Sequence, residues 1–198
     1  MLIEENEIPL AALPVEDFKA HLRLGTGFTG DNVQDAVLES FLRAAMAAVE
    51  ARSSKVLLSR GLVWTRPGWR HREGEVLPVG PVIAITRVSR VDAEGVEVDV
   101  DTDRYRLEPD LSAPRLCPRG AGLPDAPTDG AIRVRFTAGF GPAWSDLPAD
   151  LRQAVMLLAA HYYENRDATG LGEGCMPFGV TSLLERYRPL RVYAGGRA

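Results

Sequence analysis

The segment Gly25–Gly30 has the glycine spacing that could bind a cofactor. It reads Gly-Thr-Gly-Phe-Thr-Gly, a G-x-G-x-x-G pattern, directly before an expected helix. In dinucleotide-binding proteins such glycines let backbone N–H groups approach a pyrophosphate at a helix N-terminus. That fingerprint follows a strand within a βαβ unit, whereas residues 14–24 have a helical pattern here. A turn between two helices explains the glycines at least as well, so we predict no cofactor and keep a nucleotide-binding enzyme as an alternative.

His161 and Glu164 are the residues best spaced to share a metal ion. They lie three positions apart in an expected helix, a spacing that puts both side chains on one face. A metal site needs three or four converging ligands, and the only other histidines are His21 and His71. We therefore predict no metal site and interpret the pair as part of a polar cluster.

The alternating aspartates Asp99, Asp101 and Asp103 have the spacing that begins a calcium-binding loop. Such a loop needs glycine at its sixth position and glutamate at its twelfth. Arg104 and Asp110 occupy those positions, so a solvated strand face is the better interpretation. Because no nucleophile elbow and no P-loop motif occur either, the sequence offers no catalytic residue.

The composition is that of an ordinary soluble domain. The 198 residues are 45% apolar and 25% charged, and the formal net charge of −4 disfavours a dedicated nucleic-acid binder. Two cysteines, Cys117 and Cys175, are too few for a disulfide framework and indicate reduced thiols in a cytoplasm. No apolar run is long enough for a bilayer and the N-terminus is acidic, so we expect neither a membrane span nor a secretory signal.

The expected elements run from helices to strands and back to helices. Helical patterns cover residues 14–24, 31–53, 148–165 and 180–187. Strand patterns cover residues 62–64, 82–91, 96–100, 104–107 and 132–136. The turn between 82–91 and 96–100 predicts a hairpin, whereas the proline-rich residues 108–130 predict a loop.

Antiparallel hairpins without crossover helices argue against a parallel α/β sheet. We therefore predict an α+β fold, with a small helical bundle core and an antiparallel β module inserted between the second and third main helices. The expected parts are an N-terminal helical part (1–54), a β-rich insertion (55–141), a C-terminal helical part that completes the bundle (142–187) and a docking tail (188–198).

Two of the helices carry apolar side chains at helical spacing. In the helix at 31–53 the expected stripe is Val33, Val37, Phe41, Ala44, Ala48 and Ala51. In the helix at 148–165 the expected packing residues are Leu151, Val155, Leu158, Tyr162 and Tyr163. Residues 154–160 of the latter have no polar side chain, so this helix must be covered on every face. The cover comes either from its own chain alone or partly from neighbouring subunits.

The C-terminal segment is the best candidate for partner binding. Arginines alternate there with aromatic and aliphatic residues, and no acidic residue follows Glu185. Such side chains are typical of interface hot spots, although chain ends are also commonly frayed. The candidate partner-binding residues are Arg186, Tyr187, Arg188, Leu190, Arg191, Val192 and Tyr193.

Several segments resemble the head–tail connector (adaptor) proteins of tailed phages and of phage-derived gene transfer agents. The likeness lies in Leu147–Leu158 and His161–Arg166 of the long helix, in Val134–Gly141 before it and in Val180–Arg188 after it. Pro78–Val91 is similar to the strand entry of the same family. The likeness rests on the order of these parts rather than on one diagnostic motif.

The resemblance implies a structural protein of the virion neck, made in the bacterial cytoplasm and without enzymatic activity. A member of this family forms a dodecameric ring under the portal protein, extends the DNA channel and receives a downstream neck or stopper protein, with its C-terminal part docked on the portal. DNA would pass without sequence-specific binding, and no membrane is involved. The acidic residues Glu97, Asp99 and Asp101 are a hypothetical channel or rim face. A stopper or tail terminator is the alternative within the particle.

Overall fold

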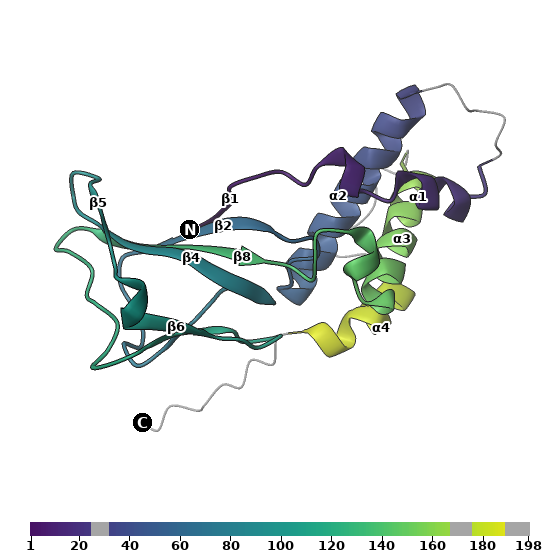
Figure 1. The fold of residues 1–198 in the computed structure, drawn as a ribbon. Coiled ribbons are helices and arrows are strands. Elements are labelled where there is room, and N and C mark those ends of the chain that lie inside the picture. The colour runs from purple at the N-terminus through teal and green to yellow at the C-terminus, as the bar shows by residue number, and fades with distance from the viewer. Residues whose placement is uncertain (25–31, 167–175, 189–198) are drawn as a thin grey trace.

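The computed structural model describes residues 1–24, 32–166 and 176–188, which form a helical bundle at one end and a β module at the other (Figure 1). The helices are α1 (Val15–His21), α2 (Asn32–Ser53), α3 (Ala149–Glu164) and α4 (Phe178–Leu184), with 3-10 turns η1 (Leu10–Ala12), η3 (Thr102–Arg104), η4 (Trp144–Asp146) and η5 (Glu185–Tyr187). The α+β prediction is confirmed, and every described strand except β1 lies between α2 and α3. None of the described helices is both long and apolar enough to span a bilayer.

The ends of α3 follow directly from its sequence. Pro148 stands just before the first helical residue, where its missing N–H costs nothing, and Asp150 places negative charge in the first turn. At the other end, the Asn165 side-chain amide donates to the His161 carbonyl oxygen at 2.9 Å. This bond satisfies one of the carbonyl groups that a helix end leaves free.

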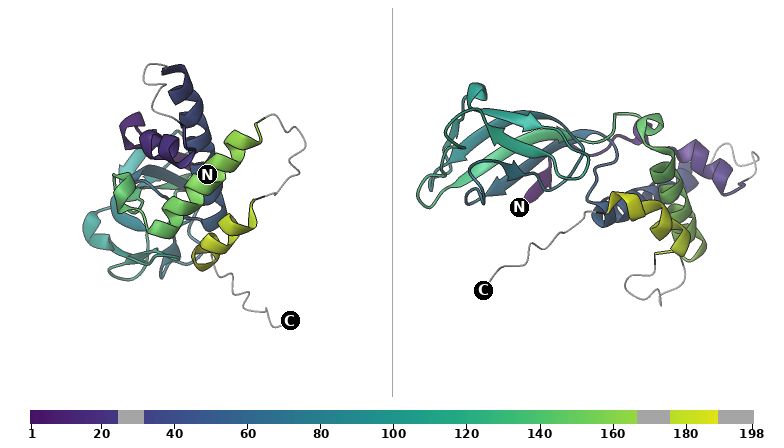
Figure 2. Two further views of the ribbon diagram at one scale, coloured as in Figure 1. Left: turned by 90° about the vertical axis from the view of Figure 1, so that its right-hand side faces the viewer. Right: turned by 90° about the horizontal axis from the view of Figure 1, so that it is seen from below.

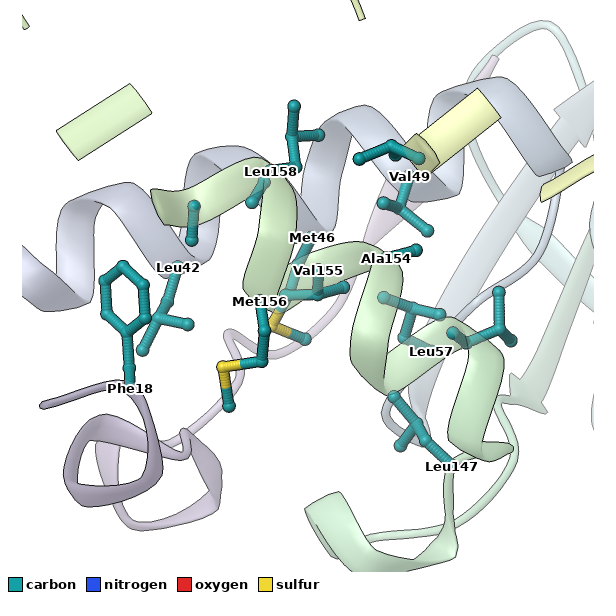
Figure 3. Packing of buried hydrophobic residues seen from close by; sticks show 14 of the residues in the cluster. Phe18, Leu42, Met46, Val49, Leu57, Leu147, Ala154, Val155, Met156 and Leu158 are labelled. Atoms are coloured by element: carbon teal, nitrogen blue, oxygen red, sulfur yellow. The ribbon is translucent and has the colours of Figure 1, made fainter. Parts of the chain in front are cut away.

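The long helix α3 forms the centre of the helical core. Figure 3 shows Ala154, Val155 and Leu158 of α3 packed among side chains of α1 and α2. The predicted packing residues Leu151, Val155 and Leu158 are at most 1% exposed, and Tyr162 and Tyr163 are half-buried. One copy of the chain therefore covers most of α3, and neighbouring subunits are not needed for that purpose.

Among the described side chains, the predicted stripe of α2 was right only at Phe41 and Ala48, which are half-buried and pack against the helical core. The buried face of α2 consists of Leu38, Leu42, Ala45, Met46 and Val49. Val37 is 43% exposed, and Ala44 and Ala51 are also on the exposed side. The helix is apolar on two faces, and the face with the larger leucine side chains is the one that packs on α3, because it buries more apolar area.

The β module is built from two antiparallel sheets. The larger sheet has the order β1 (Leu2–Glu4), β2 (Arg60–Arg66), β8 (Ala131–Ala138), β4 (Val82–Val91), β5 (Glu97–Asp99). The smaller has the order β3 (Glu75–Val76), β7 (Arg115–Pro118), β6 (Tyr105–Glu108). Leu62, Val134 and Phe136 of the larger sheet and Leu116 of the smaller one share a second buried cluster. The β4–β5 pairing confirms the predicted hairpin.

Two strands depart from the sequence-based expectation. Residues 2–4 pair with β2 in the sheet, although this stretch was assigned to the helical part. Residues 115–118 form β7 inside the expected loop and pair with both β3 and β6. β7 was missed because it is only four residues long and ends in Pro118, so its buried Leu116 and Cys117 make no readable alternation.

Candidate assembly surfaces

Tyr187 belongs to the helical core and not to a partner-binding surface, which corrects the prediction for this residue. Val180, Leu184 and Tyr187 lie on one helical face and are each at most 1% exposed. The Tyr187 hydroxyl donates to Asp150 Oδ1 at 2.8 Å, and its ring stands edge-on to Phe140 at 6.5 Å. Burial, together with this hydrogen bond, raises the pKa of Tyr187 to about 12.

The two predicted arginines beside Tyr187 are exposed. The Arg186 side chain is 69% exposed and pairs with Asp150 Oδ2 at 3.2 Å, and Arg188 pairs with Glu185 at 3.3 Å. The other predicted residues of the segment, Leu190, Arg191, Val192 and Tyr193, lie outside the described residues. The described chain therefore ends next to the first turn of α3 with two exposed arginines, each paired with a carboxylate of its own chain.

The tyrosines at the far end of α3 pack against α2. The ring of Tyr163 lies edge-on to Phe41 with centroids 6.0 Å apart, and the Arg166 guanidinium lies 5.1 Å above the Tyr163 ring. Arg166 itself is exposed. The C-terminal end of α3 therefore presents a positive charge that its own chain holds by stacking.

The solvent-facing side of the larger sheet, here called the outer sheet face, carries equal numbers of arginines and acidic residues. Its charged residues are Glu5, Arg87, Glu97, Asp99, Arg133 and Arg135. Glu97 pairs with Arg133, with Arg135 at 2.9 Å and with Arg87 at 3.5 Å. Asp99 pairs with Arg87 at 2.6 Å. Arginines therefore neutralise Glu97 and Asp99, two of the three residues of the expected acidic face, whereas Asp101 is exposed.

Replacing Glu97 with glutamine tests this network. The hydrogen bond from Arg135, helped by Ser89 and the charges of Arg133 and Arg135, lowers the Glu97 pKa from 4.5 to about 2. A lowered folded-state pKa adds stability above pH 4.5, and this stability is lost as the pH falls towards 2. We expect the variant to lose about 1–2 kcal/mol of unfolding free energy at pH 7, at the upper end for surface networks.

Thermal unfolding at pH 7 and at pH 3 checks this prediction. The difference between wild type and Glu97→Gln should shrink at pH 3, where the wild type has lost part of the same contribution. Glu94→Gln, at an exposed turn position of the same hairpin, is the control. Its thermal stability should match that of the wild type at both pH values. If the difference in stability between wild type and Glu97→Gln were the same at pH 7 and pH 3, the assigned pKa shift would be contradicted.

A buried ion pair joins the helical bundle to the β module. The Arg60 side chain is 6% exposed and donates from Nη2 to Glu50 Oε2 of α2 at 2.6 Å and to Glu4 Oε1 of β1 at 2.7 Å. Glu50 Oε1 also accepts from the Leu57 backbone N–H at 2.7 Å. Sequence reasoning missed this junction, since its residues are far apart in the chain and form no motif.

The structure bears on only some of the sites considered for cofactor or metal chemistry. Gly25–Gly30 lies outside the described residues. Within the described ranges no group of three His, Cys, Asp or Glu side chains could hold a metal ion. His161 Nδ1 lies 3.2 Å from the Asn165 amide, and Asp101 accepts from the Asp103 backbone N–H at 3.1 Å. These polar groups serve local structure.

Of the comparisons with known proteins, the one with solved structures finds similar chains. No protein-family model matches the chain, and no curated protein matches it. A chain in the neck of an empty gene transfer agent particle, computed with C6 symmetry, is 50% identical over 98% of both chains, with a TM-score of 0.89. Chains from the virion of a native gene transfer agent particle and from a native neck computed with C12 symmetry are 49% and 46% identical over 98% of both chains, with TM-scores of 0.85 and 0.84. With this identity over nearly its whole length, the chain belongs to the head–tail connector family, among the neck proteins of gene transfer agent particles.

Proposed function

We propose that this protein is the adaptor of a gene transfer agent or phage particle, a structural and non-enzymatic protein that forms a ring under the portal. The observation that carries the proposal is the likeness to neck chains over 98% of the sequence, including a neck computed with C12 symmetry. A twelve-membered ring is the simplest assembly that fits that symmetry. Its function is to extend the DNA channel and to join the head to the tail.

The portal contact is proposed at the C-terminal end of the chain. Arg186 and Arg188 are exposed there, and their guanidinium groups are suited to bidentate contacts with carboxylates on a partner. Leu190, Arg191, Val192 and Tyr193 continue the same alternation of basic and apolar residues. We keep these residues as the portal-binding segment and remove Tyr187 from it, because Tyr187 is needed inside the helical core.

The outer sheet face suits a surface past which DNA must slide. Free arginines would hold phosphate groups through counterion release. The arginines of this face are paired with Glu5, Glu97 and Asp99, so the face offers DNA little net positive charge. DNA would therefore pass without sequence-specific binding, and the opposite end of the ring would receive a downstream neck or stopper protein.

A stopper or tail terminator is the second candidate within the neck. Such proteins are dominated by strands, whereas α2 and α3 form a substantial helical bundle here. A further alternative, a nucleotide-binding enzyme using Gly25–Gly30, predicts a thermal shift with nicotinamide or adenine nucleotides. We expect no shift with either class.

Affinity capture with the portal protein tests the proposed function. The chain shortened to residues 1–188 keeps the buried Tyr187 and lacks the remainder of the segment. We expect intact protein to be captured and the shortened form to lose at least tenfold in affinity. A second variant, Arg186→Ser with Arg188→Ser, should weaken capture, whereas Arg72→Ser with Arg90→Ser in the β module is the matched control. Equal capture of all forms would show that the proposed segment does not bind the portal. No capture of the intact chain would contradict the adaptor assignment.

A further inference from the structure

Phe178 is the most exposed large apolar side chain among the described residues. It is the first residue of α4 and is 88% exposed. The next residue, Gly179, has no heavy atom packed within 4 Å of the position of a Cβ atom, so the helix surface beside Phe178 is also open at that point. Removing an exposed phenylalanine ring from water is favourable, so this side chain can anchor a partner.

A groove beside α1 has the chemistry to receive an aromatic ring. Leu10, Leu13, Pro14 and Val15 form its apolar lining, and Glu16, Asp17 and Asp35 its acidic rim. Its volume is about 280 Å³, and a cavity of about 150 Å³ already admits benzene. Leu10 is 55% exposed, and the Glu16 side chain is 84% exposed. We call this feature the α1 groove.

The α1 groove and Phe178 lie on opposite sides of one subunit. Seen from the end of the helical bundle, α1 and α4 flank α3 on its two sides (Figure 2, left), and Figure 1 also separates them. A phenylalanine on α4 therefore cannot reach the groove of its own chain. A contact between two different patches on opposite sides is head-to-tail, and it closes into a ring when the rotation per copy fits.

The charges around the two features are complementary. Glu16 and Asp17 are exposed at the α1 groove, and Lys19 pairs with Glu16 at 2.8 Å and with Asp35 at 2.6 Å. One lysine therefore faces three rim carboxylates, and the rim keeps a net negative charge. Arg166 lies two residues after the last residue of α3 and is exposed. Among the described residues, its recorded partner is the Tyr163 ring and not a carboxylate. An aromatic side chain and an arginine from one copy fit an apolar groove with an acidic rim on the next.

We propose that Phe178 of one copy inserts into the α1 groove of the next copy, with Arg166 facing Glu16 and Asp17, and that this is a subunit contact of the ring. The inference rests on the proposed adaptor function and adds to it the surface by which the ring closes. Its partner is a second copy of this chain.

Assembly on the portal, measured by mass photometry and negative-stain microscopy, tests the contact. Phe178→Asp should raise the concentration needed for half-assembly at least tenfold, as expected for the loss of an interface anchor. Val76→Asp, at a 47%-exposed position of the smaller sheet, is the matched control and should assemble like the wild type. Normal assembly of Phe178→Asp would overturn the contact and leave the adaptor function intact, whereas failure of the wild type to form rings would contradict the adaptor function itself.

Cross-linking gives a result that does not depend on weakened assembly. In a Cys175→Ser background, Leu10→Cys with Phe178→Cys should form disulfides between copies and give a ladder of multimers on a non-reducing gel. Val76→Cys with Phe178→Cys should give none. Rings without the ladder would overturn the proposed contact.

A charge exchange tests the polar part of the contact. Arg166→Glu alone should weaken assembly by several-fold, and adding Glu16→Arg and Asp17→Arg should restore it. Assembly that is equal in all three proteins would exclude Arg166 from the contact.

Discussion

Replacing Phe18 with alanine is expected to lower the unfolding free energy by about 3–5 kcal/mol, the range for a large side chain removed from a packed core. Phe18 is 0% exposed and is the one buried residue that α1 contributes to the helical core. α1 has seven residues, too few to be stable without packing. Apart from this ring, its main side-chain link to α2 is the ion pair from Lys19 to Asp35. Urea denaturation followed by circular dichroism measures the loss.

Leu10→Ala separates the stability of α1 from its role in assembly. Leu10 is 55% exposed, so this variant should change the unfolding free energy by about 0.5 kcal/mol or less. It should nevertheless weaken ring assembly, because Leu10 lines the α1 groove. If Phe18→Ala were as stable as Leu10→Ala, α1 would not be anchored in the way described.

Replacing Arg60 with methionine is expected to cost about 3–5 kcal/mol of unfolding free energy, the range for breaking a buried ion pair from one side. The change leaves Glu50 without its positive partner, although only 15% of the Glu50 side chain is exposed. It also loosens β1, since Glu4 is held by the same guanidinium. Chemical denaturation at neutral pH measures the effect.

Two comparisons separate the Arg60 charge from its packing. Glu4→Gln should cost no more than about 1 kcal/mol, because the Glu4 side chain is 51% exposed and its pairing is screened by water. Arg60→Met combined with Glu50→Leu should recover part of the loss, as no buried charge then remains unpaired. Recovery is incomplete because the Leu57 N–H loses its acceptor. A double variant less stable than Arg60→Met would show that Glu50 serves mainly through that backbone bond.

The sequence predicts the long elements well because each carries a complete periodic pattern. α2, α3 and β4 lie where the spacing of apolar residues puts them, and β4 begins and ends at the expected residues. The buried face of α2 could not be read, because Val37, Ala44 and Ala51 form a second apolar stripe that only tertiary packing separates from the first. The short strand β7 has too few residues for a pattern.

The candidate surfaces are harder to predict, since they depend on which side chains are buried in the core and which remain exposed. Tyr187 has the same residue type and neighbours as an interface anchor, yet it is buried at 1% exposure and hydrogen-bonded to Asp150. Phe178 gave no signal in the sequence, and its availability follows only from the position of α4. The Arg60 junction joins β1, α2 and β2. Local sequence patterns do not predict contacts between elements this far apart in the chain.

The insertion of the β module between α2 and α3 has a consequence for synthesis on the ribosome. Residues 54–148 must emerge before α3 can meet α2, and α4 follows later still. The nascent chain therefore holds α2 without its main packing partner while the sheets form, and bringing these distant segments together slows closure of the bundle. Since Phe178 and α4 are made after the residues of the α1 groove, a polypeptide interrupted before α4 lacks half of the proposed subunit contact. With the proposed contact, this order of elements would keep incomplete chains from extending the ring.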